Sequence, residues 1–505
     1  MSKPVVWGAL AVVLMASAAL YLTRLSVVPP YLMHDEVNFS LQAHAISTTG
    51  RDTNGRFMPV YFSEIGFEAG RDPLMIFWTA AWLTVLPLSD ATVRFPTALL
   101  GVISIGLMFV TARRMFGDTF ALVAAAFLAV TPGFFTNTRL ALSITYGIPF
   151  ALAWLYCARR AEVDSGRWPV AAGLWLGLGL YSYLASTVLM PVYLLATVIL
   201  FWSAGRMKAT VAMIAGFSMM MLPLAGWLIY HPDRFTNIAT AYAITGDNPI
   251  TMRDRLTAFW MFFNPDYLFI SGDGRMTNST RVAGLFPIAF AFLIPIGLIR
   301  LARGVAGVSG RLVVAGFLLA PLATAASGRL DINRVLITIP FGVLAAVAGL
   351  LFAVSFAKTA KRSQVFVAML LLSIAAQSVV GYRYYFGSYR VAAGTWFGGD
   401  NRYAINAVLD RIVDRTGAQV YLDRRTPIER YWRLYAAARE RDDLANIPAY
   451  YDSLPSILQG ARVGALVVCE GREDPCASLG SGWAKKESVF GADGASTHQI
   501  YVRER

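Results

Sequence analysis

Charged residues are scarce in this sequence. Only 15% of its 505 residues are Asp, Glu, Lys or Arg, whereas a soluble globular domain carries about a quarter. Hydrophobic residues make up 56% of the chain, and the mean hydropathy is +0.52. This composition excludes an ordinary soluble enzyme, because the apolar runs are too many to form one buried core. The chain is therefore predicted to be a polytopic α-helical membrane protein.

Cysteine is also rare, with three residues in the whole chain. Cys157 falls in an apolar run, where packing accounts for it. Cys469 and Cys476 lie close together in the polar C-terminal part. They would form a disulfide in an oxidising compartment, and two free thiols are the alternative. The sequence leaves both states open.

Acidic residues are fewer than basic ones, which gives a formal net charge of +13. The excess suggests nucleic-acid binding at first, but its distribution indicates a different cause. Fourteen basic residues and three acidic ones lie at the N-terminus and in five short loops between apolar runs. This is the positive-inside pattern of membrane proteins, which sets orientation. Nucleic acid is therefore not an expected partner. The basic residues are Lys3, Arg113, Arg114, Arg159, Arg160, Arg167, Arg206, Lys208, Arg300, Arg303, Arg311, Lys358, Lys361 and Arg362.

Eleven apolar segments are predicted to span the membrane, with the N-terminus cytoplasmic and the C-terminus periplasmic. The first is interpreted as an uncleaved helix, since no small-residue cleavage site follows it. The run 73–88 is short for a span, and the charge bias favours a helix in the outer interface. The predicted spans are residues 4–23, 95–112, 118–135, 145–158, 168–181, 187–203, 209–229, 284–299, 312–326, 335–357 and 364–381.

Residues 383–505 differ in character from the rest. They are polar, with β-type runs at 419–422, 463–468 and 499–502 and helical stretches near 426–441 and 453–460. We therefore predict two domains: a transmembrane domain over 1–382 and a small periplasmic α/β domain over 383–505. The first outer loop, 24–94, belongs to the transmembrane domain in this division and is predicted to be the catalytic loop.

Two adjacent carboxylates, Asp35 and Glu36, follow the first apolar segment. Carboxylates beside a membrane need water, a cation or a basic partner. A solvated loop pair is the ordinary explanation for them. A catalytic loop is the alternative, and the motifs that surround the pair favour it.

Loop 24–94 resembles a known family. Its ordered motifs are similar to those of GT-C-fold glycosyltransferases of the family-39 type, which are relatives of the protein O-mannosyltransferases and of the lipid A aminoarabinose transferase. Residues 1–400 carry the resemblance. The motifs are His34-Asp35-Glu36, Gly50-Arg51-Asp52 with Gly55, Pro59-Val60-Tyr61-Phe62, Arg71-Asp72-Pro73-Leu74, Val93-Arg94-Phe95-Pro96, Arg139, Asp266-Tyr267-Leu268-Phe269, Gly272-Asp273 and Asn333-Arg334.

The resemblance implies a GT-C fold and a polyprenyl-monophosphate-linked sugar as donor. It also implies transfer on the outer face of the inner membrane, usually with inversion. It does not identify the acceptor, which would be an envelope lipid, polysaccharide or protein. The expected partners are the lipid-linked donor, membrane lipids and that acceptor.

Inverting transfer needs a base for the acceptor proton, and Asp35 is our choice. Glu36 is expected to orient it, although a helical loop could exchange the two roles. Guanidinium groups stabilise the charge that grows on a departing phosphate. For any single arginine at an outer helix end, anchoring to lipid headgroups is the alternative. The predicted phosphate-binding residues are Arg71, where relatives often have lysine, Arg139, Arg281 and Arg334.

Six further residues are predicted to contact substrate, although an interfacial aromatic belt is the alternative for the two tyrosines of the fifth span. They are Asp52, Tyr181, Tyr183, Asp266, Tyr267 and Asp273. The sequence departs from the family in one place. Relatives carry an acidic residue shortly after Arg139, but no carboxylate occurs over 140–145. Either Ser143 takes a binding role, or the second acid is Asp266 or Asp273. No cofactor is certain, and one Asp-Glu pair allows a divalent metal without defining its site.

Two other functions compete with the glycosyltransferase. A transporter or flippase for a lipid-linked saccharide would place ionisable groups at the bilayer midplane. Here polar groups gather at the outer helix ends and the helix centres are apolar. A sensor whose soluble domain binds a ligand would not require the Asp-Glu pair.

Overall fold

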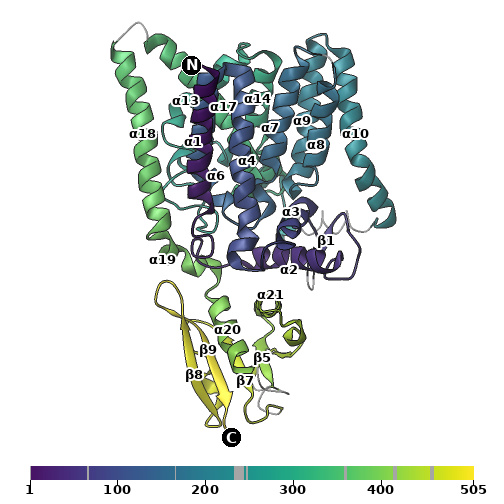
Figure 1. Ribbon diagram of the computed structural model, residues 1–505, viewed down its shortest axis with the longest axis vertical. Coiled ribbons are helices and arrows are strands. Elements are labelled where there is room, and N and C mark those ends of the chain that lie inside the picture. The colour runs from purple at the N-terminus through teal and green to yellow at the C-terminus, as the bar shows by residue number, and fades with distance from the viewer. Residues whose placement is uncertain are drawn as a thin grey trace. The chain divides into compact units, whose positions relative to one another are not determined.

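The computed structural model describes residues 2–505, except for 65–66, 165, 233–243, 246–247, 358–360, 413–417 and 455–459. At 64, 67–71, 244–245, 248–249, 357 and 363 the backbone alone is described. The chain forms two compact units (Figure 1). One comprises Met1–Thr23, Met58–Trp78 and Phe95–Arg383, and the other comprises Arg24–Phe57, Thr79–Arg94 and Tyr384–Arg505. Segments of the predicted catalytic loop thus pack with the C-terminal residues.

The first unit is mainly helical, because an α-helix satisfies its own backbone polar groups where water is absent. Its helices are α1 (Lys3–Leu22), α5 (Asp118–Ala129), α6 (Pro132–Thr138), η1 (Ser143–Thr145), α7 (Gly147–Ala161), α8 (Trp168–Gly179), α9 (Leu184–Ser203), α10 (Met207–Tyr230), α12 (Met252–Met261), the π-helix η2 (Asp266–Ile270), α13 (Phe290–Ala302), α14 (Gly307–Leu319), α15 (Leu322–Ala326), α16 (Ile332–Val335), η3 (Leu336–Thr338) and α17 (Ile339–Ala357). Two short hairpins accompany them: β1 (Phe62–Glu64) with β2 (Phe67–Arg71), and β3 (Ile244–Thr245) with β4 (Asn248–Pro249). Three helices carry residues of both units: α3 (Pro73–Leu83), α4 (Asp90–Phe116) and α18 (Lys361–Phe386).

Each of the eleven predicted spans coincides with a helix or a pair of consecutive helices. Within the described residues, seven helices are long and apolar enough to cross a membrane. An eighth span arises if α5 and α6, which are bent by 59° against each other, are counted as one. The eleven crossings and the orientation of the termini therefore stay predictions.

Glycine permits the closest helix contact of the predicted fifth span. A Cβ atom at Gly173 of α8 would overlap the carbonyl oxygen of Met213 in α10. A Cβ atom at Gly216 of α10 would likewise overlap the carbonyl oxygen of Val170. Small residues on both surfaces let the two backbones touch, as in other membrane helix pairs. The glycines of α8 and α10 therefore allow the two helices to pack with their backbones in contact.

Two predicted boundaries were wrong. The helix expected over 73–88 is α3 and ends at Leu83. The span expected from residue 284 begins at Phe290. The backbone N–H groups of Leu285 and Phe286 donate to Tyr267 and Leu268 of the π-helix. Residues 285–286 are therefore hydrogen-bonded to η2, which hydropathy does not reveal.

The second unit contains α2 (His34–Thr49), which follows α1 in the chain, and a small α/β fold. The helices of this fold are α19 (Tyr389–Ala393), η4 (Gly394–Phe397), α20 (Asn401–Ile412), α21 (Ile428–Ala437), η5 (Asp442–Leu444) and η6 (Pro475–Leu479). Its strands are β5 (Val420–Asp423), β6 (Pro448–Tyr451), β7 (Leu466–Glu470), β8 (Trp483–Phe490) and β9 (Ser496–Arg503).

The five strands form one mixed sheet in the order β6-β5-β7-β9-β8. β5 is parallel to β6 and β7, and β9 is antiparallel to β7 and β8. The three predicted β-type runs correspond to β5, β7 and β9, which are the inner strands. The helix predicted near 426–441 is α21. Most of the stretch 453–460 lies outside the described residues.

The two C-terminal cysteines are joined. Cys469 of β7 and Cys476 of η6 form a disulfide with a Cα–Cα distance of 6.1 Å. Both are fully buried in one apolar cluster with Val467 and Tyr451. Of the two alternatives that the sequence left open, the structure has the disulfide.

Candidate functional site

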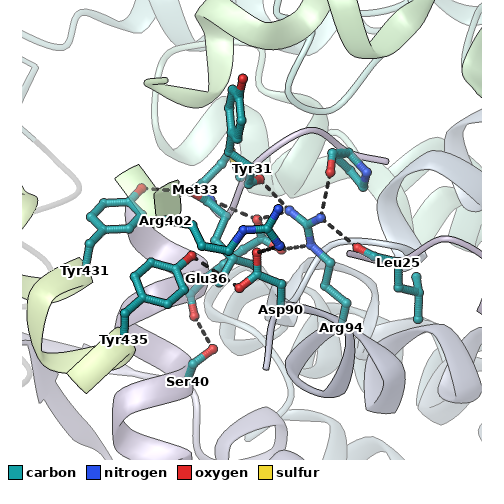
Figure 2. Close-up of polar contacts among 12 residues, drawn as sticks. Leu25, Tyr31, Met33, Glu36, Ser40, Asp90, Arg94, Arg402, Tyr431 and Tyr435 are labelled. Carbon is teal, nitrogen blue, oxygen red and sulfur yellow. Dashed lines mark hydrogen bonds and ion pairs between the residues drawn. The ribbon is translucent and has the colours of Figure 1, made fainter. Parts of the chain in front are cut away.

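Glu36 and Arg94 form a buried ion pair in the second unit (Figure 2). Arg94 Nε lies 2.8 Å from Glu36 Oε1, and Arg94 Nη2 lies 2.9 Å from Glu36 Oε2. The contact is therefore bidentate, which is the geometry that a guanidinium favours with a carboxylate. Glu36 is 0% exposed and Arg94 is 1% exposed. Glu36 Oε2 also accepts a hydrogen bond of 2.9 Å from the backbone N–H of Met33, which precedes α2.

The other donors of Arg94 hold the loop before α2. Its Nη1 donates to the carbonyl oxygens of Leu25 at 3.0 Å and Pro29 at 2.8 Å. Its Nη2 donates to the carbonyl oxygen of Tyr31 at 2.5 Å. A guanidinium has five N–H donors, and Arg94 uses all five on this loop and on Glu36. The pair therefore fixes the path of residues 25–36.

Asp35 has the opposite environment although it is adjacent to Glu36. Its side chain is 33% exposed, and its Oδ1 lies 3.4 Å from Nε2 of His34. It occupies the first turn of α2, where backbone N–H groups without helical partners and the helix dipole favour negative charge. Asp35 is therefore an accessible carboxylate on a fixed support, whereas Glu36 is enclosed.

Residues of the C-terminal fold contact the same support. Tyr431 of α21 donates through its hydroxyl to the carbonyl oxygen of Leu32 at 2.8 Å. One turn later, the Tyr435 hydroxyl donates to Asp90 Oδ1 at 3.2 Å. Arg402 Nη1 lies 3.0 Å from the other oxygen of Asp90. Burial raises the pKa of Tyr431, so its hydroxyl remains a donor. Figure 2 shows both tyrosines beside the Glu36–Arg94 pair.

Asp52, a predicted substrate contact, organises a turn. Its side chain is 0% exposed and lies 2.6 Å from Arg56 Nη2. Its Oδ1 accepts from the backbone N–H groups of Asn54 and Arg56. The amide of Gln42 in α2 bonds both the hydroxyl and the N–H of Thr53. These contacts tie the turn to α2, and no substrate role follows from them.

In the first unit, the Arg71-Asp72 motif ends the first hairpin. The backbone of Arg71 pairs with Phe62, and the Arg71 side chain lies outside the described residues. Asp72 is 6% exposed and accepts a hydrogen bond of 2.8 Å from Ser143 Oγ. Ser143 follows Arg139 in the place where relatives carry an acid. A carboxylate does adjoin this position, but Asp72 supplies it.

Arg139 caps a helix. Its Nη1 donates to the carbonyl oxygens of Leu20 at 3.0 Å and Tyr21 at 2.6 Å, and its Nη2 donates to that of Thr23 at 2.8 Å. These are among the last carbonyls of α1, which have no partner within the helix. Arg139 is 0% exposed, and its guanidinium lies over the ring of Phe135. These contacts are those of a structural residue.

Tyr181 lies in a helix break. Its hydroxyl donates to the carbonyl oxygen of Met220 at 2.7 Å and accepts from the N–H of Leu224 at 3.1 Å. It thereby bridges the turn of α10 that Pro223 interrupts. Tyr183 is half-buried directly before α9. Tyr181 is thus accounted for by helix packing.

The three residues predicted in the loop after α10 differ in environment. Asp266 is exposed and accepts from Ser271 Oγ at 2.5 Å. Tyr267 is 6% exposed, and its hydroxyl has no hydrogen-bond partner within the described part of the chain. Asp273 is 8% exposed and accepts from the N–H groups of Arg275 and Ile332.

A small charged cluster surrounds Asp273. Arg275 Nε lies 3.5 Å from Asp273 Oδ1, and Arg275 Nη2 lies 2.7 Å from Asp331 Oδ1. Asp331 caps the short helix α16 through the N–H of Asn333. Burial raises the pKa of Tyr267, and the negative charges of Asp273 and Asp331 raise it further. The Tyr267 hydroxyl therefore stays protonated beside two carboxylates and one guanidinium.

The last two predicted arginines lie in the same unit. Arg281 is exposed, with a left-handed backbone at φ +59°. Arg334 is half-buried in α16, three residues after Asp331. Across the residues that the structure describes, no group of three or more His, Cys, Asp or Glu side chains is placed to hold a metal ion.

Sequence reasoning missed several of these residues. Arg94 belongs to a family motif but received no role from the sequence, and Asp72 drew notice only as the neighbour of Arg71. The pairs Tyr431–Leu32 and Asp90–Arg402 are separated by hundreds of residues, so no local pattern reveals them. One signal was available in the sequence: Tyr431 and Tyr435 are four residues apart and therefore share one face of a helix. No sequence pattern indicated Arg402.

Comparisons with known proteins agree with this architecture. Residues 71–230 match the family model of dolichyl-phosphate-mannose-protein mannosyltransferases. No curated protein gives a significant sequence match. ArnT from Cupriavidus metallidurans in the apo state superposes with a TM-score of 0.64 at 13% identity, covering 99% of this chain and 98% of that one. Its undecaprenyl-phosphate complex gives 0.62 at 14% identity, with 98% of both chains covered.

A second solved protein shares the fold at a lower TM-score. The archaeal oligosaccharyltransferase AglB from Archaeoglobus fulgidus, in complex with an inhibitory peptide and a dolichol-phosphate, superposes with a TM-score of 0.55 at 12% identity. The alignment covers 88% of this chain and 64% of that one. The solved structures establish the fold, and the family model matches about a third of the chain. The chain therefore has the GT-C fold of ArnT, and over residues 71–230 it is similar to the dolichyl-phosphate-mannose-protein mannosyltransferases.

Proposed function

We propose that this protein transfers a sugar from a polyprenyl monophosphate to an envelope acceptor, with Asp35 as general base. The observation that carries the proposal is the contrast between two neighbouring carboxylates. Glu36 is enclosed by Arg94, whereas Asp35 is one-third exposed on the same rigid helix start. A general base must be reachable by the acceptor and fixed in position. Asp35 meets both requirements.

The chemical step is a single displacement at the anomeric carbon. Asp35 takes the proton of the acceptor hydroxyl while that oxygen attacks C1 of the sugar. The bond from C1 to the phosphate oxygen breaks, and the electron pair leaves with the polyprenyl phosphate. Attack from the face opposite to the leaving group inverts the configuration.

The donor proposal follows the relatives. One solved ArnT holds undecaprenyl phosphate and the solved AglB holds dolichol-phosphate, so we propose a polyprenyl-phosphate sugar here as well. The leaving phosphate gains charge, which guanidinium groups stabilise. Arg71, Arg281 and Arg334 remain the proposed partners. The contacts of Arg139 with α1 leave it as the weakest proposal of the four.

The acceptor is an envelope lipid, polysaccharide or protein, and transfer takes place on the outer face of the inner membrane. In this arrangement the N-terminus is cytoplasmic and residues 383–505 are periplasmic. The disulfide of Cys469 with Cys476 supports an oxidising compartment for that domain.

The test is a deletion of the gene, followed by mass spectrometry of envelope glycans, lipids and lipid-linked sugars. We expect one saccharide-bearing envelope species to disappear and one polyprenyl-monophosphate sugar to accumulate. Wild-type protein should reverse both changes. Asp35→Asn should reverse neither, because loss of a general base lowers the rate by about 10²–10⁴.

Asp410→Asn is the matched control. It makes the same chemical change at a carboxylate of α20 that is 66% exposed, and it should reverse both changes fully. Membrane levels of all variants are measured by immunoblot. Full restoration by Asp35→Asn would remove Asp35 from the mechanism. A deletion strain with unchanged glycans and unchanged lipid-linked sugars would refute the transferase proposal as a whole.

A further inference from the structure

A cavity of about 180 Å³ lies in the second unit, at the end of β7. Its wall consists of Tyr31, Glu470, Arg472, Asp493, two threonines and five glycines. A water molecule occupies about 30 Å³ in the liquid, so the volume corresponds to about six waters. The cavity is therefore large enough for one small ring and far too small for a lipid chain.

The charges of the lining select against one class of ligand. Among the described residues that line the cavity there is no aliphatic side chain, and the carbon atoms that form most of its accessible wall belong to glycines and polar residues. Arg472 is the guanidinium of the wall, and its Nη2 is already 2.8 Å from Asp493 Oδ2. With Glu470 the wall carries two carboxylates against one cation, so an anionic ligand would meet net repulsion. A neutral or cationic polar molecule fits this charge pattern.

Hydrogen-bonding groups are plentiful around the cavity. The Tyr31 hydroxyl accepts from the N–H of Ala492 at 2.7 Å, which leaves its own proton available to a ligand. Oε2 of Glu470 is buried and has no hydrogen-bond partner within the described chain. Burial raises the pKa of Glu470. A buried acceptor without a partner is costly, but this oxygen has almost no accessible surface and is not itself a contact for a ligand in the cavity.

Gly394 lines the cavity and is a position from which a side chain could fill it. Gly394 has φ −52° and ψ −43°, a right-handed helical conformation that any residue adopts. Alanine would be favoured there by about 1 kcal/mol on helix propensity. A Cβ atom at this position would meet Ala492 Cβ at 3.7 Å, which is ordinary contact. Neither the backbone conformation nor a steric clash of the Cβ atom therefore requires glycine at this position. A side chain larger than alanine would fill the cavity.

We propose that this cavity binds a single sugar unit that is neutral or amino-substituted, through hydroxyl contacts with Tyr31 and the exposed glycine backbone. Vicinal hydroxyls suit a wall of carboxylates, hydroxyls and peptide groups, and an aromatic ring suits the apolar face of a sugar. The proposal goes beyond the transfer reaction and does not depend on which residue is the base.

Occupancy of the cavity would reach the catalytic loop through one residue. The side chain of Tyr31 lines the cavity, and its carbonyl oxygen accepts from Arg94 at 2.5 Å. Asp35 follows four residues later. A sugar against Tyr31 would therefore steady the segment that carries Asp35, and the ligand is best understood as a non-reacting unit of the glycan that the enzyme handles.

The test uses the purified full-length protein in detergent and saturation-transfer NMR with a defined panel. The probes are mannose, galactose, N-acetylglucosamine, glucosamine and glucuronate. We expect at least one uncharged or amino sugar to bind, with a dissociation constant on the order of millimolar. Glucuronate should bind at least about tenfold more weakly.

Three variants localise the binding. Gly394→Leu, which fills the cavity, and Thr395→Trp, at an exposed position of its rim, should each weaken sugar binding at least tenfold. Gly394→Ala adds one methyl group and should stay within about threefold of wild type. Thermal unfolding confirms that each variant is folded. If Gly394→Leu is not folded, the binding measured with Thr395→Trp decides the test.

Two outcomes would overturn the proposal: no binding by any sugar of the panel, or equal binding by wild type and a folded cavity-blocking variant. Preferential binding of glucuronate would also refute the charge argument. None of these outcomes affects the proposed transfer, which is tested separately by the gene deletion and by Asp35→Asn.

Discussion

Replacing Arg94 by lysine should uncouple the catalytic loop from its support while preserving the charge. Lysine has three N–H donors against the five of arginine. At least two of the hydrogen bonds to Leu25, Pro29, Tyr31 and Glu36 must therefore be lost. The lysine ammonium also cannot form the bidentate contact with the carboxylate.

The magnitude follows from burial. Hydrogen bonds to charged groups contribute about 1.5–3 kcal/mol each, and breaking a buried ion pair costs about 3–5 kcal/mol. With Arg94 at 1% exposure and Glu36 at 0%, we expect Arg94→Lys to cost about 3 kcal/mol or more. For a unit of this size that corresponds to a Tm lowered by roughly 6–12 °C. At temperatures where the variant is folded, kcat should still fall at least tenfold, because the Asp35 loop is no longer held.

The assay combines thermal unfolding in detergent with turnover of the polyprenyl-phosphate sugar. Arg433→Lys is the matched control, since Arg433 makes an exposed i,i+4 pair with Glu429, and it should change neither quantity appreciably. The double variant Glu36→Gln with Arg94→Met removes both charges and should be more stable than Arg94→Met alone. An Arg94→Lys protein with wild-type Tm and kcat would refute the role given to the pair.

Three further perturbations have defined outcomes. Burial lowers the pKa of His498 to about 4, so between about pH 6.5 and pH 4 the unfolded chain binds a proton that the folded chain does not. The free energy of unfolding should therefore fall by about 3 kcal/mol as the pH falls through this range. Thermal unfolding across pH measures this loss, which should be absent in His498→Gln. Cys469→Ser opens an eight-residue loop closed with Cys476 and should cost about 2–3 kcal/mol in chain entropy, measurable by thermal unfolding with and without reductant. Arg71→Ala should raise the donor KM sharply, and Arg71→Lys should raise it less. Arg139→Lys should lower the Tm and leave the donor KM within twofold. The opposite pattern would assign phosphate binding to Arg139 and a structural role to Arg71.

The sequence predicted those features that local patterns determine. Helices such as α1 and α9 follow from apolar runs of spanning length, and the inner strands β5 and β7 follow from continuous β-branched and apolar residues. The strands that it missed, β6 and β8, lie at the two edges of the sheet. Edge strands are commonly polar or contain proline. β6 begins at Pro448 and β8 carries Lys485 and Lys486, so both lack the apolar signal.

The site was predictable in part for a related reason. A carboxylate beside a membrane is conspicuous, and Asp35 and Glu36 were therefore found. Their different environments could not be predicted, because Arg94 is 58 residues from Glu36 and three of its partners are backbone carbonyls. Arg139 shows how a distant contact offers a second explanation for a predicted site residue. An arginine at a helix end suggests a lipid phosphate, but this one bonds the end of α1, which is 116 or more residues away.

The support of Asp35 is shared between distant parts of the chain, so the C-terminal fold contributes to the position of the proposed base. Arg94 holds the loop from α4, and Tyr431, Tyr435 and Arg402 hold the same region from α20 and α21. If Arg94 alone fixed the loop, the C-terminal fold could be removed without changing the path of residues 25–36. Removal would instead leave the carbonyl of Leu32 and the buried carboxylate of Asp90 without these partners, each at a cost. If Asp35 is the base, the C-terminal fold is one half of its support, in agreement with the compact unit that residues 24–57, 79–94 and 384–505 form.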